Sequence, residues 1–295
     1  MAIELDPKNA IAYTARCQTY IKSLKEAQPA IRDCSKAIEL NPSSESAYIA
    51  RGDAFFIQHL PDEAISDYSM AILLEPKSAE TFRLRGEAYY EKGNYQKSVA
   101  DLETATELKS GNGLAYFSLG QVYFDMGDVS KAIASLSKAI EIDNLNADAY
   151  FSRGRAYFAL GNFENAVADF REKSVGSPSD PYSRIWLELA ERRGQKAGHM
   201  SEAVLRVDMR AWPAPIIRMY LGSENPDKVF ASAKEAGETV SQKQTCEADF
   251  YVGEFVLLQG NKVEAARLFH LAEADCPRHL FEWSSAKAEL ATLGG

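Results

Sequence analysis

Small and aromatic side chains return along the chain with a period of 34 residues. Gly52, Gly86, Gly120 and Gly154 mark this period. An aromatic residue stands four positions before each glycine and another three positions after it: Tyr48, Phe82, Tyr116 and Tyr150, then Phe55, Tyr89, Tyr123 and Tyr157. Residues three and four apart share one face of an α-helix, so the pattern predicts one such helix in each period.

The second half of each period has its own pattern of small and large residues. The small positions are Ala64, Ser98, Ala132 and Ala166, and the large ones are Tyr68, Leu102, Leu136 and Phe170. Pro76 and Pro178 close two of the periods, where proline disfavours a continued helix. The pattern therefore predicts a second helix, antiparallel to the first, with the small residues allowing close approach. This pattern resembles the tetratricopeptide repeat (TPR) family.

The resemblance implies an all-α fold, a right-handed superhelix (α-solenoid) of helix hairpins. The repeats are expected at residues 10–44, 45–78, 79–112, 113–146 and 147–180, after a half repeat at 1–9. The pattern weakens after Pro178, so residues 181–245 are expected to be helical but irregular, with helices at 182–205, 214–221 and 226–238. A further TPR-like repeat is expected at 246–279, followed by a capping helix at 281–292 within the last region, 246–295.

The start of the chain resembles the end of a repeat. Ala2–Pro7 matches Ala37–Pro42, while the front of that repeat is missing. A solenoid normally begins with a polar cap, so we expect the chain to be cut from a longer protein. A frayed natural terminus is the alternative. A truncated end would leave apolar helix surface uncovered and favour self-association there.

Composition narrows the function classes. The 295 residues are 46% hydrophobic and 25% charged, enough to bury a large core. The net charge of −9 argues against nucleic acid, whose binding needs a cationic surface. No stretch approaches the roughly 20 consecutive apolar residues of a membrane span. We therefore expect a globular chain that does not bind nucleic acid and has no membrane span.

The TPR resemblance implies a site on the concave surface, which the first helix of each hairpin lines. The family's inward positions carry over to aromatic and acidic residues for the most part: Asp53, Phe56, Glu87, Tyr90, Phe117, Gln121, Phe124, Phe151, Arg155 and Phe158. The basic clamp by which chaperone-binding members hold a carboxylate is absent, because Thr14, Gln18 and Asp53 stand at its positions. This groove suits apolar or basic peptide segments. The alternative is that some of these aromatic residues are core.

The C-terminal part resembles a narrower family, the NlpI-type bacterial lipoproteins. The resemblance rests on Trp212–Ile217, Tyr220–Gly222, Ala248–Glu254 and Ala286–Leu290. Members of that family are TPR adaptors that bring envelope hydrolases and a protease together. The chain lacks their lipobox cysteine and signal peptide, which a truncated N-terminus would remove. The resemblance implies a periplasmic or outer-membrane-anchored protein; without it, a cytoplasmic one is expected.

The four cysteines bear on the redox compartment. Cys246 is expected to open the first helix of the last hairpin and Cys276 to end the second, so a disulfide between them is possible. Free buried thiols are the alternative there, and they are what we expect of Cys17 and Cys34. The His and Cys spacing makes no zinc site, and no phosphate loop or nucleophile motif is present. We expect no enzyme activity, no metal and no cofactor.

These observations predict a protein-interaction scaffold or adaptor that binds peptide segments of other proteins in the groove. Two alternatives remain open. One is a structural solenoid that self-associates through an exposed end. The other is the regulatory region of a longer protein whose N-terminal part is missing.

Overall fold

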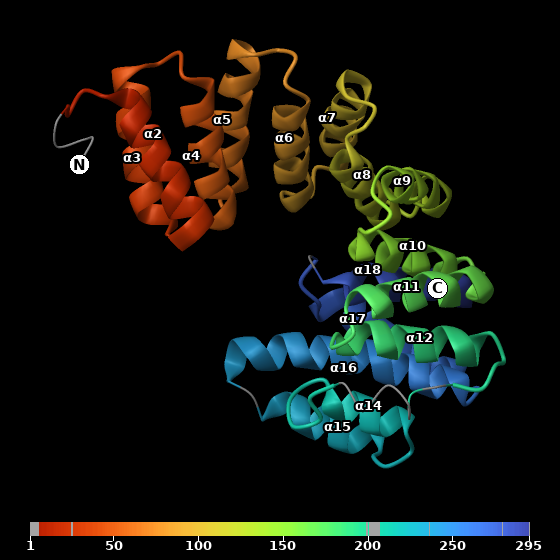
Figure 1. Ribbon diagram of the computed structural model, residues 1–295. Coiled ribbons are helices and arrows are strands. Elements are labelled where there is room, and N and C mark those ends of the chain that lie inside the picture. The colour runs from red at the N-terminus through yellow and green to blue at the C-terminus, as the bar shows by residue number, and fades with distance from the viewer. Residues whose placement is uncertain are drawn as a thin grey trace. The chain divides into compact units, whose positions relative to one another are not determined.

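The chain folds as two compact units. A computed structural model describes residues 6–24, 26–198, 200, 207–235, 237–278 and 280–294. Unit 1 comprises Met1–Val122 and unit 2 comprises Tyr123–Gly295, so the boundary falls within one helix, α8 (Gly113–Asp125). The secondary structure within the described ranges is helical, without a β-strand (Figure 1).

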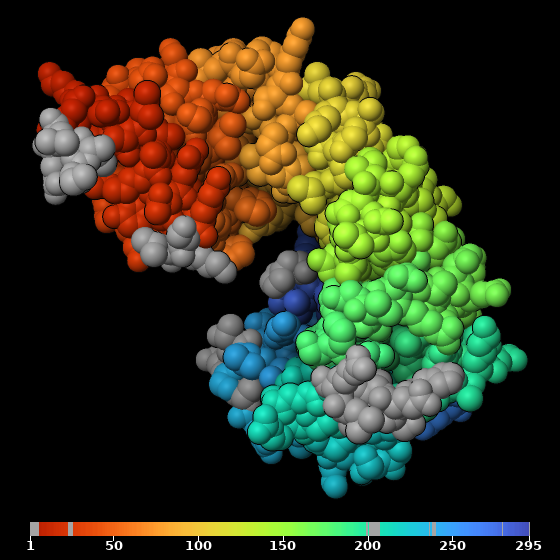
Figure 2. Space-filling view, in the orientation of Figure 1, coloured from red at the N-terminus to blue at the C-terminus, as the bar shows by residue number. Residues whose placement is uncertain are grey.

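Unit 1 is a row of antiparallel helix hairpins. Its helices before α8 are α2 (Ala10–Thr19), the π-helix η1 (Tyr20–Leu24), α3 (Ala27–Leu40), α4 (Glu45–Ile57), α5 (Pro61–Leu74), α6 (Ala79–Glu91) and α7 (Tyr95–Leu108). Helix α2 packs against α3, α4 against α5 and α6 against α7; between hairpins, α3 packs against α4 and α5 against α6. In the space-filling view, the hairpins from red to yellow form one continuous surface (Figure 2). We call the first helix of a hairpin its A helix and the second its B helix.

Unit 2 continues with hairpins and then folds back on itself. Its helices after α8 are α9 (Val129–Ile142), α10 (Ala147–Ala159), α11 (Phe163–Gly176), α12 (Pro181–Arg193), α14 (Ala214–Tyr220), α15 (Pro226–Lys234), α16 (Glu238–Leu258), α17 (Lys262–Asp275) and α18 (Phe281–Leu293). The last helix, α18, packs against α17 and α16 and also reaches α10 (Figure 1). A large core joins the helices from α10 to α18, with Trp186, Phe250 and Phe269 fully buried.

Glycines on the A helices let the B helices approach closely. A Cβ atom on Gly52 would lie 2.7 Å from Cε1 of Tyr68, and one on Gly154 would lie 2.7 Å from Cε1 of Phe170. Real Cβ atoms do not approach so closely, so the ring of the B helix occupies the space that a larger A-helix residue would need. The 34-residue glycine period therefore reflects one packing contact repeated in successive hairpins.

Asparagine and aspartate begin many of the helices. The side chains of Asn94, Asn146 and Asn162 each accept a hydrogen bond from a backbone N–H in the first turn of the following helix. Asp180 does the same for α12, whose first residue is Pro181. Such caps satisfy donors that the helix itself leaves without partners. The loops within hairpins and between them thus both carry residues that begin the next helix.

Two helices predicted in the irregular section are shorter in the structure. The helix expected at 182–205 ends at Arg193, because Gly194 caps it and Gln195 has a left-handed φ of 58°; residues 201–206 lie outside the described residues. The helix expected at 226–238 ends at Lys234, and Gly237 precedes the next helix. The helix expected at 214–221 is present as Ala214–Tyr220.

The A helix of the last hairpin is longer than expected. It runs over 21 residues, Glu238–Leu258, so Cys246 lies inside the helix and does not open it. The predicted capping helix is present as α18, but it does more than cover α17, since it also packs on α10. The all-α fold of helix hairpins is confirmed. The expected half repeat at 1–9 falls largely on residues 1–5, which lie outside the described residues.

Candidate functional site

Three positions on the A helices repeat with the 34-residue period and define a common face. On α10 these positions carry Phe151, Arg155 and Phe158. We call the corresponding residues of unit 1, apart from Ile49, the inner face of unit 1: Asp53, Phe56, Arg83, Glu87, Tyr90, Phe117 and Gln121. All seven are half-buried. The predicted site residues of unit 1 therefore lie partly exposed on α4, α6 and α8.

Hydrogen bonds hold the polar residues of this face in place. Arg83 of α6 donates from Nη1 to Oε1 of Glu87 at 2.6 Å and from Nη2 to Oε1 of Glu80. Ser118 of α8 donates from Oγ to the same Glu87 oxygen at 2.7 Å. Helices α6 and α8 are thus linked through one carboxylate, and a single arginine lies between two acidic residues.

Asp53 has a perturbed environment. Its Oδ1 accepts a hydrogen bond of 2.8 Å from the Tyr68 hydroxyl, which reaches it from the B helix of the same hairpin. Burial raises the pKa of Asp53 to about 6, although that hydrogen bond and the charge of Arg83 favour the ionised form. A basic group from a partner would stabilise the ionised carboxylate further.

The structure closes the corresponding face in unit 2. Phe151 and Phe158 are only 7% and 3% exposed, and Phe124 and Arg155 are each 7% exposed. Phe281 of α18 packs edge-on against Phe151 with ring centroids 5.3 Å apart, and Trp186 of α12 packs against Phe158 at 5.3 Å. The prediction that these four residues line an accessible groove is therefore wrong for the structure described, because α12 and α18 cover them.

Arg155 of α10 makes several of the contacts that hold α18 over this face. Its Nη2 donates to the backbone oxygen of Phe281 at 2.8 Å, to Oγ of Ser284 at 2.9 Å and to Oγ of Ser285 at 3.0 Å. Its guanidinium also stacks between two rings, 4.9 Å from the centroid of Phe124 and 5.2 Å from that of Phe281. One buried cation therefore binds the first turn of α18 to α10.

A buried acidic pair holds the far end of α18. Arg193 donates from Nη1 to Glu254 at 2.8 Å and to Glu289 at 3.1 Å. Both carboxylates are almost fully buried, and burial raises the pKa of each, against the charge of Arg193. Among the described residues, no hydrogen-bond partner reaches Oε1 of Glu254. This cluster joins α12, α16 and α18.

Arginine–aspartate pairs link the two helices of several hairpins, and the sequence reasoning missed them. Arg51, Arg85 and Arg153 each donate two hydrogen bonds to an aspartate sixteen residues later: Asp67, Asp101 and Asp169. Each arginine also bonds a serine of the preceding B helix: Ser35, Ser69 and Ser137. The repeat at 113–146 has Leu119 and Ser135 at these two positions. The same 34-residue period contained this signal.

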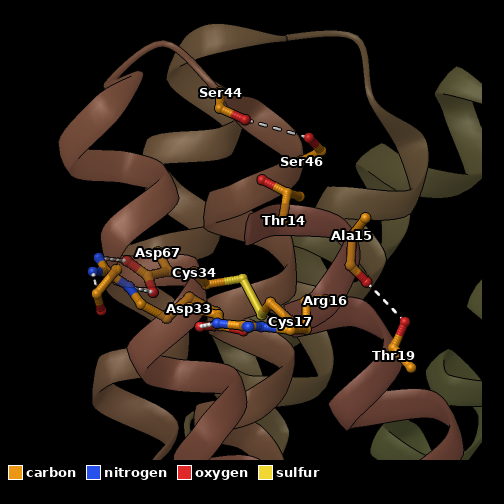
Figure 3. The surroundings of a disulfide bond; sticks show 12 residues. Thr14, Ala15, Arg16, Cys17, Thr19, Asp33, Cys34, Ser44, Ser46 and Asp67 are labelled. Carbon is orange, nitrogen blue, oxygen red and sulfur yellow. Dashed lines mark hydrogen bonds and ion pairs between the residues drawn. A yellow bond between two sulfur atoms is a disulfide. The ribbon is translucent and has the colours of Figure 1, made fainter. Parts of the chain in front are cut away.

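The structure contains two disulfides, each within one hairpin. Cys246 of α16 and Cys276 after α17 are joined, with Cα atoms 5.1 Å apart. Cys17 of α2 and Cys34 of α3 are also joined, at a Cα distance of 5.6 Å, and the Arg16–Asp33 ion pair lies beside that bond (Figure 3). The expectation of free thiols at Cys17 and Cys34 is therefore wrong, since facing positions of one hairpin bring their side chains within bonding distance.

The described residues present few features typical of a catalytic or metal site. Among the side chains that the structure describes, no three His, Cys, Asp or Glu residues gather as metal ligands would. Nor is any helix within these ranges long and apolar enough to cross a membrane. The inner face of unit 1 is mainly aromatic and acidic.

Comparison with known proteins identifies the repeat. The model of the TPR repeat family matches residues 86–127 and 120–161. The chain carries tetratricopeptide repeats. The TPR matches lie in the middle of the chain and leave the C-terminal part outside them, so the resemblance to NlpI-type lipoproteins stays a prediction.

Several solved structures share the fold. The structure of pilF from Pseudomonas aeruginosa is 18% identical, with a TM-score of 0.62, and the match covers 73% of this chain and 97% of that one. A tetratricopeptide repeat protein from Parabacteroides merdae is 16% identical, with a TM-score of 0.58 and coverage of 97% and 99%. A MamA protein is 27% identical, with a TM-score of 0.50 and coverage of 57% and 92%. At the low identities of the first two, the likeness concerns the fold alone.

Proposed function

We propose that this TPR protein is a non-catalytic interaction scaffold that binds segments of partner proteins on the inner face of unit 1. A repeat fold does no chemistry by itself, so its function depends on the side chains that it presents. The self-associating solenoid and the regulatory region of a longer protein are the alternatives.

One contrast supports this location. The same helix positions are half-buried in unit 1 but covered in unit 2, where α18 already occupies α10. In unit 2, the surface formed by these positions binds a helix of the same chain. In unit 1, the equivalent positions still expose part of each side chain. The positions that bind α18 within unit 2 are therefore accessible to a partner protein in unit 1.

The side chains of this face favour an apolar or basic partner. Phe56, Tyr90 and Phe117 supply ring surface, which binds apolar or cationic groups. Asp53 and Glu87 add carboxylates around Arg83, and such a face attracts basic groups and repels acidic ones. Segments that combine aromatic or aliphatic residues with lysine or arginine fit it best.

The disulfides support an oxidising compartment for this scaffold. Disulfides persist mainly in secreted, periplasmic and cell-surface proteins. The NlpI-type resemblance of the C-terminal part gives a narrower version of the proposal, in which the partners are envelope hydrolases or proteases. This narrower version rests on the resemblance and on the compartment together.

Affinity capture from the source cells tests the proposal. The baits are the wild-type chain, an Asp53→Asn/Phe117→Ala variant and a Leu73→Ala control; Leu73 is 71% exposed and lies on the B helix α5. Proteins captured by the wild type and the control but lost from the double variant would support the proposal. Identical sets from all three baits would contradict it, provided that all three melt at similar temperatures.

A further inference from the structure

We infer that the partner segment binds the inner face of unit 1 as an amphipathic α-helix with an aromatic residue and, one turn later, a basic residue. This inference rests on the proposed function and specifies the class of partner. It is drawn from a helix that the chain itself binds, α18 on α10.

The contact between α18 and α10 provides the template. Phe281 packs on Phe151, and one turn later Ser284 and Ser285 bind Arg155. Residues three and four apart lie on the same side of a helix, so α18 presents the aromatic residue and the two hydroxyls to α10 together. An extended segment would turn neighbouring side chains to opposite sides and could not present this set.

The inner face of unit 1 repeats the aromatic part of this arrangement. Phe117 of α8 stands at the position of Phe151, and Gln121 stands at the position of Arg155. Both are half-buried, so part of each side chain remains exposed. An aromatic side chain of a partner helix can therefore pack on Phe117 as Phe281 packs on Phe151.

The positive charge at the second position is absent from unit 1. On α8 this position carries the neutral Gln121, and on the two preceding A helices it carries carboxylates, Glu87 of α6 and Asp53 of α4. Glu87 lies next to α8, because Ser118 of α8 donates a hydrogen bond to it. Arg155 takes oxygen acceptors from α18, whereas carboxylates need donors. On the partner helix, lysine or arginine would therefore stand where α18 has Ser284 and Ser285.

The surrounding charges leave an excess of negative charge at this face. Arg83 lies between Glu80 and Glu87, so one arginine faces two carboxylates by direct contact, and Asp53 adds a third within its field. Lys22 also acts on Asp53 and Lys109 on Glu80, both through longer-range charge interactions. A partner cation one helical turn from its aromatic residue would complete the pairing.

Synthetic peptides based on α18 test the inference. The lysine peptide has the sequence Phe281–Leu293 with Ser284→Lys and Ser285→Lys. A parent peptide keeps both serines, and a helix-breaking peptide adds Ala286→Pro to the lysine peptide. Binding to the full chain is measured by fluorescence anisotropy at two salt concentrations, because screening weakens exposed charge pairs.

Protein variants locate the binding. The inner-face variant is Asp53→Asn/Glu87→Gln, which keeps the hydrogen-bonding shape but removes two charges. The matched control is Glu63→Gln/Glu107→Gln, which removes two charges from exposed positions on the B helices α5 and α7. Circular dichroism melts check that both variants stay folded.

The inference predicts that the lysine peptide binds at least tenfold more tightly than the parent and the proline peptides. It also predicts that the inner-face variant binds the lysine peptide at least tenfold more weakly than the wild-type chain does, and that the affinity of the control variant changes less than twofold. Equal binding of the proline peptide, still lost in the inner-face variant, would overturn the helical mode and leave the proposed function intact. No binding of the lysine peptide up to about 1 mM would also overturn the inference, and the capture experiment would then decide the proposed function separately.

Discussion

Replacing Arg155 by alanine tests whether α18 is held on α10 as described. The substitution removes hydrogen bonds from a buried guanidinium to Phe281, Ser284 and Ser285. Hydrogen bonds to charged groups contribute roughly 1.5–3 kcal/mol each, but they are not additive, and the released hydroxyls can find water. We therefore expect α18 to lose about 3 kcal/mol of docking free energy, within the usual range for a broken buried network.

Hydrogen exchange measured by mass spectrometry reads out this loss locally. A docking loss of about 3 kcal/mol accelerates exchange of the α18 amides by roughly a hundredfold. The matched control is Gln121→Ala, at the equivalent position of α8. Because the Gln121 side chain is only half-buried, we expect this substitution to lower the stability by less than about 1 kcal/mol. Unchanged exchange in α18, or equal acceleration by both variants, would refute the role given to Arg155.

Three other predictions concern stability. Reduction of both disulfides lowers the stability of the α2–α3 and α16–α17 hairpins by about 3 kcal/mol each, for loops of 17 and 30 residues; coincident melts with and without dithiothreitol would contradict this. Gly154→Ala costs about 1–3 kcal/mol in urea unfolding because its Cβ would lie 2.7 Å from a Phe170 ring atom, whereas Gly111→Ala, with open space around it, is nearly neutral; equal effects would refute the packing argument. Burial raises the pKa of Glu254 in the folded chain above 4.5, so the stability it contributes is complete below that pH and is lost as the pH rises through the folded pKa. Glu254→Gln should therefore flatten the fall in unfolding free energy above pH 4.5, by up to about 1.4 kcal/mol per pH unit, and an unchanged slope in urea titrations would refute this.

The hairpins were predictable because their signals are local. The 34-residue glycine period marks contacts such as Gly52 with Tyr68, which lie sixteen residues apart on the two helices of one hairpin. Helix α18 was also predicted to within one residue of its end. Periodic sequence patterns report contacts of this kind because each repeat buries its own part of the core.

The covered face of unit 2 was not predictable from the same patterns. Phe117 and Phe151 occupy equivalent positions, yet one is half-buried and the other is buried beneath α18. The contact that separates them, from Arg155 to Ser285, joins residues 130 positions apart. Nothing in the A-helix pattern distinguishes a ring that a partner contacts from one that a distant helix of the same chain covers.

The most direct test of the account is a hydrogen-exchange footprint of the chain with its captured partner segment bound. The account predicts slower exchange in the parts of α4, α6 and α8 that carry the inner face of unit 1, and unchanged exchange in α10 and α18. Protection confined to the B helices α5 and α7, or protection at α10 with release of α18, would contradict it.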